Sequence, residues 1–339
     1  MGRSLSDLIV FIGKRLLLLI PTLLGVLALT FILSVLAAPD PCLYWFPKIR
    51  PAQVAACQAQ FGLNQPVPVR FLDYLNQLLH GNWGTTPSGV PVLPTILAVA
   101  PETIELVLAA LLIMVVIGIP LGVIAASRSG RLADHLVRIF YLSGWAMPTY
   151  VGALFLALLV GPALGIPYQG DFTSTPPPIA QPTHFSVLDA MLSGQPYYVG
   201  DAVAHLILPA AALAFLNLGI ATRMTRSSML ETLPMDYVKT ARMKGLSETW
   251  VLYKHALRNS LISTTTVLGV TGGQLLASTV VIEEIFQWPG MGAYAFSALQ
   301  NNYFAAIYAV VIIFALGVII ANLAADILYG LLDPRVEWR

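Results

Sequence analysis

Charge is what this sequence has least of. Only 10% of its 339 residues are charged, whereas a soluble domain carries about 25%. Apolar residues make up 57% of the chain, and the mean hydropathy is +0.76. This shortage excludes an ordinary soluble domain. It predicts an all-α polytopic membrane protein, because apolar helices satisfy their own backbone hydrogen bonds in lipid.

Signatures of catalysis are also missing. The chain has no GxxxxGK[ST] phosphate-binding loop, no HExxH pair and no GxSxG turn. Its five histidines are scattered, and only His205, one turn after Asp201, has a suggestive neighbour. We interpret these two as a hydrogen-bonded pair rather than a metal or catalytic site. The chain is therefore expected to be no enzyme, to hold no metal or cofactor, and to bind no nucleic acid.

Six runs are long and apolar enough to cross a bilayer. We expect spans at about 16–38, 106–126, 139–160, 204–222, 261–282 and 305–328. The first run follows a basic start, as a signal peptide does. Its apolar core is too long for a signal peptide and Pro39 follows at once, so a retained span is favoured.

Positive charge is distributed unevenly about these spans. With the N-terminus inside, 15 of the 18 Lys and Arg residues lie on the cytoplasmic side, and only Lys48, Arg50 and Arg70 lie outside. Because cytoplasmic loops carry an excess of Lys and Arg, both termini are predicted to be cytoplasmic. The chain then divides into an N-terminal segment (1–15), a first span (16–38), an extracytoplasmic loop domain (39–104), a core of five spans (105–330) with a cytoplasmic loop at 223–259, and a cytoplasmic tail (331–339).

Cysteine is almost absent. Cys42 and Cys57 are the only two, and both fall in the loop domain. In an oxidising compartment a disulfide between them is expected. Two unpaired thiols are the alternative, and the sequence does not decide between them.

The middles of the expected spans lack ionisable residues. Glu102 and Glu105 lie at the outer end of the second span, whereas ion-driven pumps need such groups at membrane depth. A transporter built this way must take its energy from a partner on the cytoplasmic side. Three polar residues either line a path or serve equally well in helix packing: Asn217, Thr271 and Gln274.

The most polar long segment, 231–259, lies between two apolar runs. Asp236 favours a helix start and Gly245 a helix stop. Ala241 and Gly245 lie one turn apart on a face that permits close approach of another backbone. Positive charge adjoins this face, from Lys239, Arg242 and Lys244. The segment is a candidate docking helix for a cytoplasmic partner, with a solvated loop as the alternative.

The fifth apolar run ends in the sequence EEIFQWPGMG, residues 283–292. Its Pro and Gly residues predict a compact re-entrant or interfacial loop. Phe286 and Trp288 suit the headgroup level. The candidate residues of this loop are Glu283, Phe286, Trp288, Pro289, Gly290 and Gly292.

Several blocks, taken in order, resemble the integral-membrane permeases of bacterial and archaeal ABC importers, in the dipeptide/oligopeptide/nickel branch. The blocks are residues 223–231, 236–246, 255–259, 283–292 and 326–335, and Pro39-Asp40-Pro41 is similar to the Pro-Gly-Asp-Pro that usually follows the first span. In that family, an acidic residue, a small residue and a glycine fit a groove on the ATPase subunit. The resemblance therefore implies that Asp236, Ala241 and Gly245 seat the docking helix, with the three basic residues pairing charges.

The resemblance also implies a type I ABC importer permease fold and a set of partners. These are a second homologous permease, two cytoplasmic ATPase subunits that bind ATP and Mg, an extracytoplasmic binding protein, and the bilayer of a prokaryotic cell membrane. Di- or oligopeptides are the expected substrate, with nickel chelates, glutathione or oligosaccharides as alternatives. An ion-independent secondary transporter or channel is the rival class. A bacterial or archaeal source, and a pair of identical or different permeases, are left open.

Overall fold

The protein is described here by a computed structural model that covers residues 5–45, 51–174 and 179–332. Within these ranges the regular elements are helices, apart from an isolated β-bridge between Thr85 and Pro91. The all-α membrane fold is therefore confirmed. In chain order the elements are α1 (Leu5–Ala37), α2 (Cys42–Trp45), α3 (Pro51–Gln60), α4 (Val67–Leu79), α5 (Val92–Ile113), η1 (Met114–Gly118), α6 (Ile119–Ser127), α7 (Leu132–Ala146), α8 (Thr149–Phe155), η2 (Leu156–Val160), α9 (Gly161–Leu164), α10 (Ser186–Leu192), α11 (Pro196–Thr232), α12 (Asp236–Met243), α13 (Glu248–Trp250), η3 (Val251–Ala256), α14 (Leu257–Phe286), α15 (Met291–Gln300) and α16 (Phe304–Leu332).

In the described part of the chain, five helical stretches are long and apolar enough to cross a membrane: Ile12–Ala37, Val92–Ser127, Pro196–Thr232, Glu248–Phe286 and Phe304–Ile327. A sixth is the pair Leu132–Ala146 and Thr149–Leu164, which is bent by 109°. The sequence predicted a continuous helix there. The break falls at Met147, which is extended (φ −86°, ψ 129°), because Pro148 disfavours the helical conformation of the residue before it.

The second spanning helix begins at Val92 rather than near Leu106. Its first turns are helical because Val92 and Ile96 are fully buried against α15 and α16. This apolar packing outweighs Pro101 and the nearby carboxylates, which favour a later start of the helix. As a result, Glu102 lies inside a helix rather than in a loop before one.

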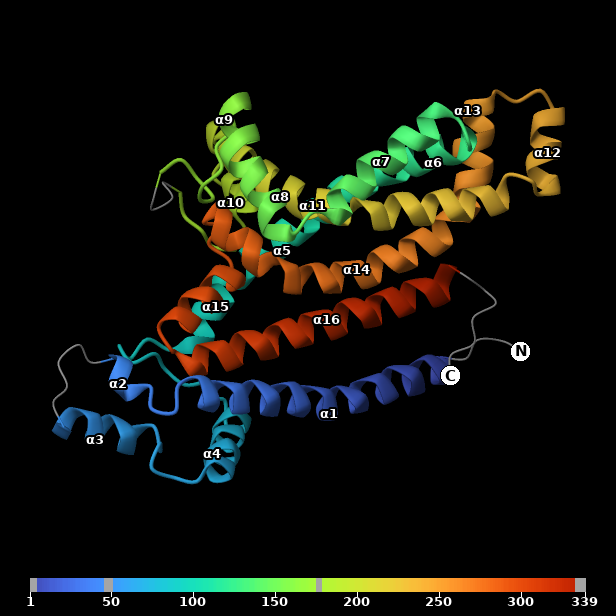
Figure 1. Ribbon diagram of the computed structural model, residues 1–339. Helices are drawn as coiled ribbons and strands as arrows, with labels where there is room; N and C mark the ends of the chain where they lie inside the picture. Colours follow the sequence, from blue (N-terminus) through green and yellow to red (C-terminus); the bar gives the residue numbers. More distant parts are fainter. Residues whose placement is uncertain (1–4, 46–50, 175–178, 333–339) are drawn as a thin grey trace.

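The long helices form a stack around α11. This helix packs against α14 and against α5, α6 and α7. α16 packs on α14, and α1 packs on α16. Figure 1 shows α12 and α13 at one end of the stack (the α12 end) and α2, α3, α4 and α15 at the opposite end (the α4 end). The N-terminal end of α1 and the C-terminal end of α16 lie toward the α12 end.

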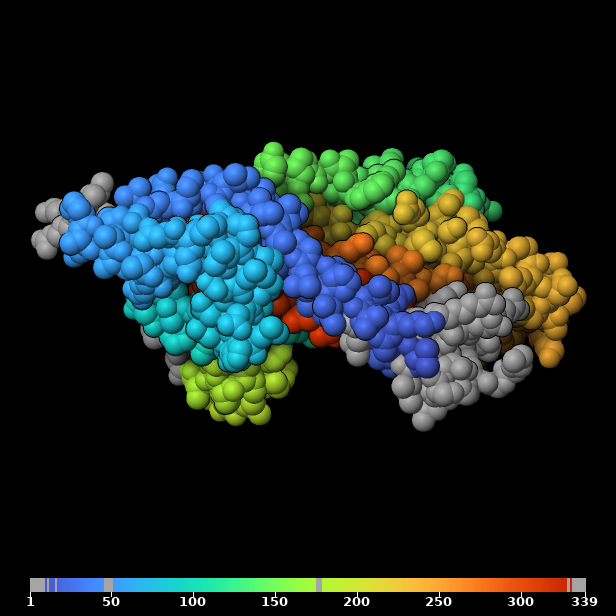
Figure 2. All heavy atoms as spheres, turned by 90° about the horizontal axis from the view of Figure 1, so that it is seen from below, coloured from blue at the N-terminus to red at the C-terminus, as the bar shows by residue number. Residues whose placement is uncertain are grey.

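The segment before α5 is attached to the α4 end of the stack. Cys42 and Cys57 form a disulfide with a Cα–Cα distance of 6.0 Å. The Trp45 indole N–H donates a hydrogen bond to the Asn301 carbonyl oxygen at 3.0 Å. One face of α4 packs on α1 and α16. Figure 2 shows α1 and the α3–α4 segment together on one face of the molecule, with α16 visible beside α1.

Small residues allow the central helices to approach closely. A Cβ atom added at Gly122 of α6 would lie 2.6 Å from the Thr225 Cβ and 2.8 Å from the Thr222 carbonyl oxygen of α11. A Cβ at Gly269 of α14 would lie 2.6 Å from the Ala325 Cβ of α16. Without a hydrophobic driving force inside lipid, such close backbone packing is a main source of helix association.

We expect Gly122→Ala to destabilise the protein by about 1–3 kcal/mol, because the new methyl group overpacks the α6–α11 contact. Thermal unfolding in mild detergent measures the effect. Gly25→Ala is the matched control, since nothing lies within 4 Å of a Cβ at that helical position. Equal unfolding temperatures for the two variants would contradict close packing of α6 on α11.

Candidate functional site

The short helix α12 lies at one edge of the molecule, away from the central helices (Figure 1). It follows Met235, which is extended (φ −68°, ψ 149°), and it ends at Met243. Gly245 then adopts a left-handed conformation (φ +75°), and its N–H donates to the Arg242 carbonyl oxygen at 2.9 Å. Glycine suits this position because it has no Cβ to clash. These bounds agree with the helix that the sequence predicted.

One face of α12 is buried in its own chain. Val238 is fully buried and Ala241 is 5% exposed. Both belong to a cluster contributed by α6, α11, η3 and the start of α14, whose other buried members are Val123, Ala126, Met229, Val251, Ala256 and Leu257. Ala241 therefore packs α12 onto its own chain, which differs from the partner-facing role that the resemblance assigned to it.

The exposed surface of α12 carries charges that already pair within the chain. Lys239 Nζ lies 3.0 Å from Asp236 Oδ1. Arg242 donates two hydrogen bonds to the Glu248 carboxylate, at 2.8 and 3.2 Å, and these raise the pKa of the guanidinium. Exposed ion pairs contribute only about 0–1 kcal/mol each. Lys244 and Gly245 are exposed beside them.

Exposed apolar side chains adjoin these charges, and the sequence analysis missed them. Met243 is 79% exposed, Trp250 is 50% exposed and Leu246 is 38% exposed. Lys254 Nζ lies 4.3 Å from the centroid of the Trp250 ring. The available signal was the presence of large apolar residues in an otherwise polar segment. Apolar groups surrounded by polar ones are typical of a protein-binding surface.

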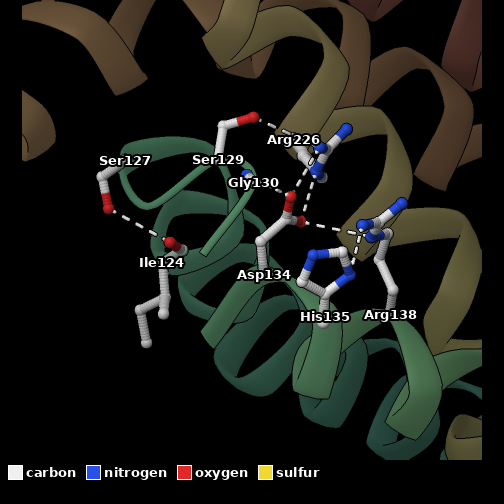
Figure 3. Close-up of polar contacts among 8 residues, drawn as sticks. All are labelled: Ile124, Ser127, Ser129, Gly130, Asp134, His135, Arg138 and Arg226. Carbon is white, nitrogen blue, oxygen red and sulfur yellow. Dashed lines mark hydrogen bonds and ion pairs between the residues drawn. The ribbon is translucent and has the colours of Figure 1, made fainter. Parts of the chain in front are cut away.

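A buried ion pair fixes the neighbouring turn between α6 and α7. Asp134 is fully buried, and Figure 3 shows its carboxylate between Arg226 and Arg138. Arg226 donates to both carboxylate oxygens, at 2.8 and 2.9 Å. The Gly130 N–H donates to Asp134 Oδ2 at 3.0 Å, and Arg226 also reaches the Ser129 hydroxyl at 3.5 Å. This network joins the 127–131 turn to α11, shortly before α11 leads into α12.

In the sequence, Arg226 and Arg138 are two of the 15 basic residues that indicate the cytoplasmic side, and Asp134 was not predicted to pair with them. The signal was present, since Asp134 is an acidic residue inside a short basic link. Its partner lies 92 positions away, so only the tertiary structure identifies it.

Removing Arg226 should leave the buried Asp134 carboxylate with only the Gly130 N–H and the more distant Arg138, whose Nε lies 3.5 Å from Oδ1. We expect Arg226→Ala to cost about 3 kcal/mol, toward the low end for a buried pair because Arg226 keeps partial contact with solvent. Arg226→Ala combined with Asp134→Ala should recover part of that loss. Chemical unfolding in detergent compares these variants with Arg131→Ala, which is exposed and expected to stay within about 0.5 kcal/mol. Additive losses in the double variant would exclude the pairing.

At the α4 end, the loop after α14 is built around a buried carboxylate. Glu283 is fully buried and accepts hydrogen bonds from Thr103 Oγ1 at 2.8 Å and from the N–H groups of Gly292 and Ala293 at 2.6 and 3.1 Å. A Cβ at Gly290 would collide with this carboxylate. Glu283, Gly290 and Gly292 therefore form one tightly packed turn between α14 and α15.

The two aromatic residues of this loop, which the sequence placed at the headgroup level, are buried inside the protein rather than exposed on its surface. Trp288 is fully buried and Phe286 is 1% exposed, and both belong to the central apolar cluster. The Trp288 indole N–H donates to the Glu102 carbonyl oxygen at 3.0 Å. The indole N–H has a protein acceptor here, so the ring can be buried without losing a hydrogen bond. Pro289 is exposed at the tip.

Further carboxyl groups join α5 to α10. The Ser186 hydroxyl lies 2.6 Å from Glu102 Oε1 and 3.0 Å from Asp171 Oδ2, and the Val187 N–H donates to Glu105 at 3.1 Å. A hydroxyl carries one hydrogen, so Ser186 donates to only one of the two carboxyl groups at a time. No role for this cluster was predicted from the sequence.

His205 and Asp201 pair as the sequence predicted, because His205 Nδ1 lies 2.9 Å from the Asp201 carbonyl oxygen. The three candidate path residues have separate environments. Asn217 and Thr271 donate to carbonyl groups of their own helices, at 2.9 and 2.8 Å, whereas Gln274 of α14 is exposed.

Comparison with known proteins identifies the family. The sequence profile of the family described as "Binding-protein-dependent transport system inner membrane component" matches residues 118–338. The chain is 41% identical over 333 residues to the di/tripeptide transport system permease protein of Pseudomonas aeruginosa, covering 96% of this chain and 98% of that protein. It is 36% identical to the dipeptide permease protein of Escherichia coli (96% and 98% covered) and 36% identical to the oligopeptide permease protein of Bacillus subtilis (97% and 99% covered).

The chain belongs to this family of inner-membrane components of binding-protein-dependent transport systems. It is a multi-pass permease subunit of an ABC importer. Solute reaches such a permease from a binding protein, and ATP is bound by ATPase partners rather than by this chain.

Proposed function

We propose that this chain forms half of the translocation path for di- or oligopeptides and that α12 docks on an ATPase subunit. The peptide substrate is supported by the three relatives, which are permeases for di/tripeptides, dipeptides and oligopeptides and match this chain over nearly its whole length. Nickel chelates and oligosaccharides are the alternative substrates. Uptake assays with the cognate binding protein and partner subunits, competed with dipeptides, a nickel chelate and a short oligosaccharide, test this assignment. Competition by the chelate or the sugar alone would overturn it.

The seating of α12 is the observation that carries the docking proposal. α12 is held by Val238 and Ala241 on the ends of α6, α11 and the η3–α14 run. A force applied to α12 therefore reaches the central helices directly. ATP binding by the partners biases the path between two states because the nucleotide-bound ATPases fit one state better.

In the proposed orientation the α12 end faces the cytoplasm. The described ends of α1 and α16 lie toward that end (Figure 1), and the excess of basic residues in the connections there supports it. The disulfide-containing segment 39–91 then faces the extracytoplasmic side, where the binding protein delivers solute.

A second homologous permease completes the path in this proposal. Gln274 is exposed on a spanning helix of the isolated chain. A polar amide facing lipid is costly, so Gln274 is better placed against a water-filled path or a second subunit. Asn217 remains a candidate for the same path, whereas Thr271 is 2% exposed and packs inside the chain.

We expect Met243→Asp to weaken binding of the ATPase subunit by about tenfold, because the new carboxylate would lose its hydration when the partner covers this side chain. Lys239→Ala should weaken it less than about fivefold, since exposed ion pairs contribute little. Titration of the purified permease with the ATPase subunit measures both. Met191→Asp on α10 is the control, a methionine 57% exposed and outside the proposed surface. Equal losses for Met243→Asp and Met191→Asp would rule out docking through this surface.

Gly245→Val should uncouple ATP hydrolysis from uptake, because a β-branched residue at φ +75° costs about 1–2 kcal/mol and displaces the end of α12. Gly245→Asn should retain most coupling, since asparagine tolerates the left-handed conformation. The amount of peptide taken up per ATP hydrolysed, in vesicles reconstituted with the partner subunits and the binding protein, is the readout. Gly89→Val imposes a similar strain at φ +82°, also with open space around its Cβ, and should leave coupling intact. Full coupling by Gly245→Val would contradict the assignment.

A further inference from the structure

Four carboxyl groups gather where α10 meets α5, at the end of the molecule away from α12 (Figure 1). They belong to Glu102 and Glu105 of α5, to Asp171, and to Asp189 of α10. The charges of the other three act on Glu102. Among the described residues, no Lys, Arg or His forms an ion pair with any of the four. Carboxyl groups that share a site without a positive partner disfavour full ionisation.

Two of the four groups have hydrogen-bond donors of their own. The Val187 N–H donates to Glu105 at 3.1 Å. Thr183 donates to Asp189 from its N–H at 3.1 Å and from its hydroxyl at 2.6 Å. Such donors suit the ionised form of a carboxyl group, so these contacts are complete without an added ligand.

Glu102 and Asp171 share a single hydroxyl group instead. Glu102 is 4% exposed, and its Oε1 lies 2.6 Å from the Ser186 Oγ. The same Ser186 Oγ lies 3.0 Å from Asp171 Oδ2. Because a hydroxyl carries one hydrogen, Ser186 cannot donate to both oxygens. If both carboxyl groups were ionised, one of these two O···O contacts would contain no hydrogen and would be repulsive.

The second oxygen of Glu102 has no partner. Its Oε2 is buried and forms no hydrogen bond with any described residue. An ionised carboxyl group held this way would be a buried charge with a single hydrogen bond, which is costly. In a neutral carboxyl group the same atom is a carbonyl oxygen, and burying it without a partner costs much less.

The elements packed against α5 supply no further contact to the Glu102 carboxyl group. α11 carries Asp201, which pairs with His205 and accepts hydrogen bonds from Thr173. α14 carries Glu283, which accepts hydrogen bonds from Thr103 and from the following turn. In the described part of the chain, no three His, Cys, Asp or Glu side chains are placed to hold a metal ion. A proton is therefore the cation that fits the Glu102 site.

We propose that this cluster is a proton-binding site and that Glu102 carries the proton. The Glu102 O–H donates to the Ser186 Oγ, and the Ser186 O–H donates to Asp171, so each of the two contacts contains one hydrogen. The proton resides on Glu102 because Asp171 keeps partial contact with solvent, which stabilises its charge.

The bound proton links three parts of the chain. Ser186 begins α10, Glu102 belongs to α5, and Asp171 lies two residues before Thr173, which is hydrogen-bonded to α11 through Asp201 at 2.9 and 2.6 Å. Loss of the proton would place a buried negative charge beside Asp171 and weaken the attachment of α10 and the 171–173 segment to α5. The site is independent of the solute carried and of docking through α12.

Infrared difference spectroscopy of the purified full-length chain at neutral pH tests this proposal, because protonated carboxyl groups and carboxylates have separate C=O stretching bands. The wild type should contain one more protonated carboxyl group than Glu102→Gln. Glu284→Gln is the matched control, since Glu284 is exposed at the end of α14, and it should leave the band of the protonated groups unchanged. Equal band intensities in the wild type and Glu102→Gln would overturn the proposal.

Thermal unfolding in detergent from neutral to alkaline pH gives an independent readout. The folded chain keeps the proton whereas the unfolded chain releases it already at acidic pH, so the wild type should lose stability as the pH rises. Glu102→Gln remains neutral and can still donate to Ser186, so its melting temperature should fall by about half as much or less. Glu284→Gln should follow the wild type. The same fall in the wild type and in Glu102→Gln would show that Glu102 holds no proton.

Discussion

Burial of Val238 and Ala241 against the ends of α6, α11 and the η3–α14 run is the contact on which the proposed action of this permease depends. An eight-residue helix has little stability of its own, because helix nucleation is costly. α12 exists as a defined surface because this apolar seat holds it. Because the same apolar contacts attach α12 directly to α6, α11 and α14, a partner that moves α12 would also move these helices.

The Asp134–Arg226 pair holds the elements next to the α12 contact in place. It ties the 127–131 turn to α11 near the point where α11 leads into α12. A buried bidentate pair has strict geometry, and its loss leaves an uncompensated charge. It therefore favours one arrangement of α6, α7 and α11 over others. Close contacts at Gly122 and Gly269 serve the same purpose inside the stack, where glycine lets neighbouring helices approach.

The α4 end is organised by buried polar groups instead. Glu283 gathers Thr103 and the backbone of the following turn, and Trp288 bonds the Glu102 carbonyl group. These contacts join α5, α14 and α15 into one rigid unit. A cavity with several aromatic residues in its lining, among them Phe31, Tyr74 and Tyr308, lies where α4 meets α1 and α16. The two ends of the molecule thus differ in the interactions that hold them. Apolar packing holds α12 at one end, and buried hydrogen bonds hold the turn between α14 and α15 at the other.

The sequence by itself determined the all-α membrane class, the approximate spans and the limits of α12. These features depend on local hydropathy and on residues such as Asp236 and Gly245, which act within one helical turn. Only the tertiary structure decided that Ala241 faces inward, that Trp288 is buried and that Asp134 pairs with Arg226. It also decided that α5 begins at Val92. Each of these depends on which segments meet, because burial and ion pairing are set by neighbours distant in the chain.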